Sequence, residues 1–115
     1  MALHSKVTSV SVDSDSAERL NQLSDNVGES AAMVMRQVIR VAISREWTAE
    51  KMKLDNSRPG DVERSVLRLA LSPDLHAEVS KSAGGVGVSR FFKASLERFI
   101  ELHDLGDRSI WNLIQ

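Results

Sequence analysis

Hydrophobic and polar positions follow the same order twice along the chain. In each copy an alternating stretch precedes a run with apolar residues at helical spacing, a glycine turn and a second helical run. Val12 and Gly28 are 16 residues apart, and the same 16 residues separate Leu71 from Gly87. Such internal repetition indicates one structural unit built twice.

Each unit is predicted to contain one strand and two helices. Alternation predicts a strand, and apolar residues three and four positions apart predict a helix. The expected strands are 7–12 and 66–71, and the expected helices are 16–27, 31–43, 74–86 and 91–102. Gly28 is placed to end the first helix in the left-handed conformation. Ser30 and Ser89 are expected to cap the second helix of each unit.

The period of two divides each strand into two faces. The inward residues are expected to be Thr8, Val10, Val12, Leu67, Leu69 and Leu71. The outward residues are then Val7, Ser9, Ser11, Val66, Arg68 and Ala70. A strand this short needs a partner, and the chain carries that partner within itself.

The chain is expected to form a single domain over 1–115, which is mainly α-helical with a short two-stranded antiparallel ribbon. Its parts are a first repeat at 6–44, a linker with a short helix (47–54) at 45–64, a second repeat at 65–103 and an apolar tail at 104–115. The apolar residues of the tail are Ile110, Trp111, Leu113 and Ile114. They either fold back on the body and complete the core, or anchor a protein partner.

The charge balance gives no support for nucleic-acid binding. The net charge is −1, from 15 basic and 16 acidic residues. Segments 1–45, 46–63 and 64–115 carry about 0, −2 and +1 respectively. Nucleic-acid binders usually carry a basic patch, so any phosphate-binding face of this chain is local.

The sequence contains no recognisable enzyme or metal site. Cysteine is absent, and the three histidines are not paired with other potential ligands. No nucleophile–base set, carboxylate pair or phosphate-binding glycine loop is present. We therefore expect a non-enzymatic protein without a metal or cofactor. No apolar run approaches the roughly 20 residues of a membrane span, and a cytoplasmic location is expected.

The order of strand, helix, glycine turn and helix resembles the ribbon-helix-helix family of Arc and MetJ type. The resemblance lies in Val10-Ser11-Val12-Asp13 through Leu20 with Gly28-Glu29-Ser30, and in Leu69 through Val79 with Gly87-Val88-Ser89-Arg90. Members of that family usually dimerise through their strands, so a tandem copy implies the same arrangement within one chain, an intramolecular pseudo-dimer. Tandem members are known among accessory proteins of plasmid conjugation, and the resemblance implies either that role or transcriptional repression.

The resemblance also implies that double-stranded DNA is the partner. In the family the ribbon enters the major groove and its outward side chains read base edges. Base reading is thereby assigned to Val7, Ser9, Ser11, Val66, Arg68 and Ala70. Arg68 suits a guanine, the serines donate or accept, and the apolar side chains suit a thymine methyl.

Phosphate binding is assigned by the same resemblance to the start of the second helix of each unit, where backbone N–H groups favour an anion. Ser30 and Ser89 occupy those places, and Arg90 stands beside Ser89. Glu29, beside Ser30, opposes an anion. The alternative is a protein-binding module, antitoxin-like or a phage-type inhibitor, that keeps the scaffold without reading DNA.

Overall fold

A two-stranded ribbon and four helices make up the part of the chain that the computed structural model describes, residues 6–54 and 64–112. The elements are β1 (Lys6–Asp13), α1 (Ser14–Val27), α2 (Ala31–Ser44), β2 (Arg64–Leu71), α3 (Pro73–Ala83), the 3₁₀ turn η1 (Gly84–Val86), α4 (Val88–Asp104) and the 3₁₀ turn η2 (Ser109–Trp111). The prediction of a mainly helical domain with a two-stranded antiparallel ribbon is confirmed. None of the helices described has the length and apolarity required to cross a membrane.

The ribbon buries one of its two faces. Val10 and Val12 of β1 and Leu69 and Leu71 of β2 are almost fully buried, and Leu67 is half-buried. The period of two therefore predicted this inward face correctly, except that the side chain of Thr8 lies outside the described part of the chain. Burial of this face fixes the register, because a slip of one residue would turn it to solvent.

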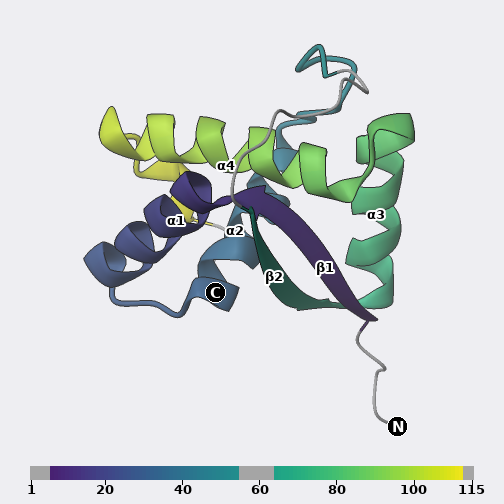
Figure 1. Cartoon of the computed structure of the whole chain (residues 1–115). Coiled ribbons are helices and arrows are strands. Elements are labelled where there is room, and N and C mark those ends of the chain that lie inside the picture. The colour runs from purple at the N-terminus through teal and green to yellow at the C-terminus, as the bar shows by residue number, and fades with distance from the viewer. Residues whose placement is uncertain (1–5, 55–63, 113–115) are drawn as a thin grey trace, which may run out of the picture.

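The two halves of the chain interlock. β1 packs against α4, whereas β2 packs against α2, so each strand contacts the second helix of the other half. Figure 1 shows α1 and α3 on opposite sides of the ribbon, with α4 running across the molecule above it and α2 behind it. α2 and α4 also pack against each other at the centre. The core is therefore shared by both halves.

Both halves supply large side chains to that core. Phe91, Phe92 and Phe99 of α4 are all fully buried. Position for position after the helix start, Ala42 of α2 corresponds to Phe99 of α4, since α2 begins at Ala31 and α4 at Val88.

The turn between α1 and α2 has the predicted chemistry. Gly28 ends α1 with φ 73°, a left-handed conformation that favours glycine. Ser30 is the N-cap of α2, and its side chain accepts a hydrogen bond from the Met33 N–H at 3.1 Å. The expected cap at Ser30 is therefore confirmed.

Replacing this cap should have a modest and specific effect. We expect Ser30→Ala to lower the free energy of unfolding by about 1 kcal/mol, because the Met33 N–H loses its acceptor. Urea denaturation followed by circular dichroism measures the change. Ser30→Asp supplies another good N-cap and is the control; equal destabilisation by both substitutions would show that the cap has no role.

The corresponding connection of the second half is built differently, and the prediction that Ser89 caps α4 is wrong. The N-cap is Gly87, with φ 88°, and Ser89 lies inside the first turn of the helix. The 3₁₀ turn η1 follows α3 directly, and Gly87 alone stands between η1 and α4, whereas residues 28–30 separate α1 from α2. The repeats therefore differ in length at this connection.

The linker does not form the expected short helix. Residues 47–54 are hydrogen-bonded turns, with Glu46 and Lys53 at φ 58° and 56°. Trp47 is nevertheless packed into the core, and the Arg98 guanidinium lies 5.5 Å from the centre of its ring. Leu54 is half-buried, and 55–63 lie outside the described residues.

The C-terminal segment folds back onto the body. Ile110 is fully buried, and its carbonyl accepts a hydrogen bond from Gln37 Nε2 of α2. Trp111 is half-buried, with its ring edge-to-face against Phe99 at 4.9 Å between centroids. These residues complete the core. Leu113 and Ile114 lie outside the described residues.

Candidate nucleic-acid interface

The outward face of the ribbon is exposed. Ser9, Arg68 and Ala70 are exposed, Val66 retains 64% of its accessible surface, and Ser11 is half-buried. The structure places these five side chains on the face that the alternation predicted. The backbone of Val7 lies opposite Ala70, but its side chain lies outside the described part.

Ser9 and Arg68 lie directly opposite each other at the centre of this face. The Ser11 N–H donates to Ser89 Oγ at 3.0 Å, off the edge of the ribbon and away from β2. Ser11 therefore belongs to a non-hydrogen-bonded pair with Val66, and alternation makes Ser9 and Arg68 such a pair as well. Side chains approach most closely in these pairs, so one cation and one hydroxyl stand together where a ligand would meet the ribbon.

Arg68 is a free cation with respect to the described part of the chain, where it forms no ion pair. Its neighbours across and along this face are a hydroxyl and two apolar side chains, not carboxylates. Lys93 of α4 is different, because its ammonium lies 3.3 Å from Asp13 and 4.0 Å from Glu97. Arg68 is therefore available to an anion or a base edge, whereas the charge of Lys93 is already balanced.

Asp13, at the junction of β1 and α1, is held in its ionised form. The Ser16 hydroxyl donates to Asp13 Oδ1 at 2.7 Å and lowers the pKa of this carboxyl below its ordinary 3.8. Partial burial opposes this effect, and the Lys93 ammonium lowers the pKa further. The ion pair joins α4 to the end of the ribbon in the other half of the chain.

This carboxyl should contribute a small pH-dependent stability. Because its folded pKa is depressed, the stabilisation is complete above the ordinary value of 3.8 and is lost as the pH falls below it through the folded pKa. We expect Asp13→Asn to cost less than about 1 kcal/mol at pH 7, since the pair is partly exposed, and nothing at the acid end. Urea titrations across this pH range measure the difference. Asp15→Asn removes the same charge from the same helical turn and should not reproduce this pH dependence; if it does, Asp13 is not the group responsible.

The N-termini of α2 and α4 differ in the groups that they offer to an anion. The N-terminus of α2 carries a side-chain cap from Ser30, and the exposed carboxylate of Glu29 precedes it. The N-terminus of α4 has no side-chain cap and no acidic residue in its first turn, which contains Arg90. Backbone N–H groups and the helix dipole favour an anion at such an end. Of the two helix starts, that of α4 is therefore the better candidate for a phosphate anchor.

Ser89 links that anchor to the ribbon. Its Oγ accepts the Ser11 N–H at 3.0 Å and so holds the first turn of α4 against the edge of β1. A hydroxyl that accepts one hydrogen bond still has a proton to donate. The sequence pattern placed Ser89 near the interface but as the cap of α4. Its contact with Ser11 was missed because a hydrogen bond between residues 78 positions apart leaves no local signal.

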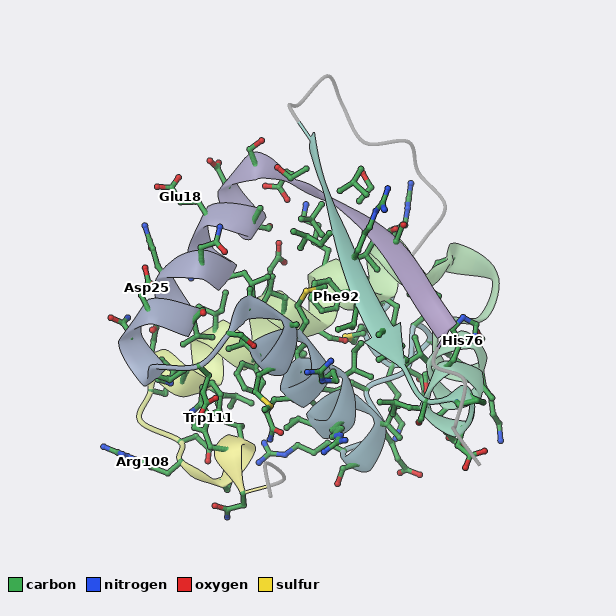
Figure 2. All side chains as sticks on the ribbon, turned by 90° about the horizontal axis from the view of Figure 1, so that it is seen from below. Glu18, Asp25, His76, Phe92, Arg108 and Trp111 are labelled. Carbon is green, nitrogen blue, oxygen red and sulfur yellow. The ribbon has the colours of Figure 1, made fainter. Side chains whose placement is uncertain are left out.

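A hollow in the surface lies away from the ribbon and was not predicted. A hollow of ≈ 760 Å³ is bordered by the end of α1 and the C-terminal segment, with His103 and Trp111 among its lining residues. The Trp111 Nε1–H donates to His103 Nδ1 at 3.3 Å. Figure 2 shows Trp111 and Arg108 on the side of the molecule remote from β1 and β2. Within residues 6–54 and 64–112 no cluster of three or more His, Cys, Asp or Glu residues is arranged to hold a metal ion.

Comparison with protein-family models, with curated proteins and with solved structures found no match to the chain. The geometry of the ribbon and of the helices around it is therefore the basis of the proposed function.

Proposed function

We propose that the chain is a pseudo-dimeric ribbon-helix-helix protein that binds double-stranded DNA by inserting β1 and β2 into the major groove. The observation that carries the proposal is the exposed outward face of an antiparallel ribbon. At its centre, opposite Ser9, lies Arg68, which forms no ion pair within residues 6–54 and 64–112. A two-stranded ribbon fits the width of the major groove, and an arginine there can contact a guanine through two hydrogen bonds.

The arrangement of the helices supports the same proposal. Each strand is held by the second helix of the other half, as expected if the two repeats imitate two chains of a dimer. Asp13 and Ser72, the N-caps of α1 and α3, are 59 residues apart, and so are Ser9 and Arg68. The ribbon centre thus lies on an approximate two-fold axis between the repeats. Transcriptional repression and an accessory role in conjugation remain the two contexts expected for such a protein.

Binding to a random-core duplex library tests the proposal. The full chain should retain DNA at about 50 mM salt, and the logarithm of the binding constant should fall linearly with the logarithm of the salt concentration as phosphate contacts release counterions. Fluorescence anisotropy of a labelled duplex measures this slope. Failure to retain any duplex at low salt would refute the proposal.

The alternative, a protein-binding module, is favoured by two exposed apolar side chains. Val66 retains 64% of its accessible surface and Leu105, just after α4, retains 76%. Under this alternative, Leu105→Ser should abolish capture of a stoichiometric protein partner and leave the fold unchanged. Of the predicted tail anchors, Ile110 is fully buried and so is not accessible to a partner, whereas Trp111 is half-buried.

A further inference from the structure

The outward face of the ribbon differs on the two sides of its own centre. Exchanging the two repeats would exchange Ser9 with Arg68, because these residues are 59 positions apart and lie opposite each other. One side of the centre therefore carries a hydroxyl and the other a cation. The two pairs next to the centre are also unlike: Val7 opposite Ala70, and Ser11 opposite Val66.

The helix starts on the two sides of the ribbon also differ from each other. Beside β1 lies the uncapped start of α4, joined to Ser11 through Ser89 and followed by Arg90. The helix that packs on β2 is α2, whose start is capped by Ser30 and preceded by Glu29. A phosphate on the α4 side meets free helix-dipole charge, whereas one on the α2 side meets a carboxylate as well.

On the basis of the proposed function, we infer that the chain recognises a duplex site without dyad symmetry, and in one orientation only. Two identical chains present the same side chains to both half-sites, so their operators are palindromic. Here Arg68 is the cation that the described side chains place beside the approximate two-fold axis, and it selects one guanine, on one strand. The stronger phosphate anchor of α4 then fixes which flank of the site lies beside β1.

Selection from a random-core duplex library tests the sequence of the site. The selected motif should differ from its own reverse complement and contain one central guanine whose replacement weakens binding about tenfold or more. The double variant Ser9→Arg with Arg68→Ser moves the cation to the equivalent place on β1. Its motif should carry the central guanine on the other strand. Both positions are exposed, and circular dichroism verifies that the variant is folded.

Energy transfer tests the orientation. The chain contains no cysteine, so Asn21→Cys on α1 and Ser80→Cys on α3 each create a single labelling site. These exposed positions are 59 residues apart and occupy matching places on helices at opposite sides of the ribbon (Figure 1). The acceptor is placed on one end of the selected duplex. Energy transfer should be efficient from the label on one of the two helices and inefficient from the label on the other, because one orientation is expected in about tenfold excess or more.

Three results are possible, and they separate the inference from the proposed function. A non-palindromic motif bound in one orientation supports the inference. A palindromic motif, or equal transfer from the Asn21→Cys and Ser80→Cys labels to either DNA end, overturns it while DNA binding stands. Absence of any bound duplex at low salt refutes the proposed function and the inference together.

Discussion

Phe99→Ala should lower the free energy of unfolding by about 3–5 kcal/mol, the usual loss when a large aromatic side chain is removed from a core. Phe99 is fully buried on α4, where it contributes to the central helix packing and supports the ring of Trp111 at 4.9 Å. The neighbouring core side chains Phe92, Leu96 and Ile100 of the same helix are buried as well, so the cavity would open inside the packed core. Urea denaturation followed by circular dichroism and tryptophan fluorescence measures the loss.

Two further substitutions make this prediction specific. Phe99→Leu keeps most of the volume and should cost under about 1.5 kcal/mol. Leu105→Ala, in the same region but 76% exposed, should remain within about 0.5 kcal/mol of the wild type. A loss below about 1.5 kcal/mol for Phe99→Ala would mean that the core can collapse around the cavity and that α4 is less central than its packing indicates.

The elements that could be predicted from the sequence are those with a local cause. Alternation produced both strands, and three-to-four spacing produced all four helices to within a few residues of their ends. Gly28 and Ser30 were identified because a left-handed glycine and a serine cap act through bonds to their immediate neighbours. Even the outward face of the ribbon is local information, because a strand with a period of two has only two faces to present.

What could not be predicted depends on contacts between distant parts of the chain. The short helix expected at 47–54 has too few residues to be stable by itself. The segment forms turns instead, and Trp47 packs into the core. Ser89 was assigned as a cap because serine is a preferred N-cap residue, but α4 begins before it, at Val88 after Gly87. The hydrogen bond from Gln37 to the Ile110 carbonyl joins positions 73 residues apart, and no pattern in either segment predicts it.

The candidate site shows the same division. Its six outward residues followed from the alternation, but the pairing of Ser9 with Arg68 follows from the register between strands that are far apart in sequence. The near-neutral net charge argued against DNA binding, yet total charge does not report where cations stand. In the structure Lys93 is neutralised by two carboxylates, whereas Arg68 has no ion-pair partner in the described part of the chain.

Arg68→Ala should weaken binding to the selected duplex by about ten- to a hundredfold, because a bidentate arginine–guanine contact contributes about 1–3 kcal/mol. The same substitution should relax the preference for the central guanine and leave the other positions of the motif unchanged. If Arg68 reads a base, the slope of binding against salt should stay nearly constant, whereas loss of a phosphate contact would reduce it by about 0.9. Anisotropy titrations at several salt concentrations, on the selected duplex and a base-substituted one, distinguish the two roles.

Arg108→Ala is the matched control, since it removes the same exposed charge from the C-terminal segment on the side remote from the ribbon (Figure 2). It should bind DNA within about twofold of the wild type, with an unchanged motif, because a cation away from the groove adds only a screened long-range attraction. Equal weakening by Arg68→Ala and Arg108→Ala would show that the chain responds to net charge alone. Base reading by the ribbon would then be wrong, even though some DNA is bound.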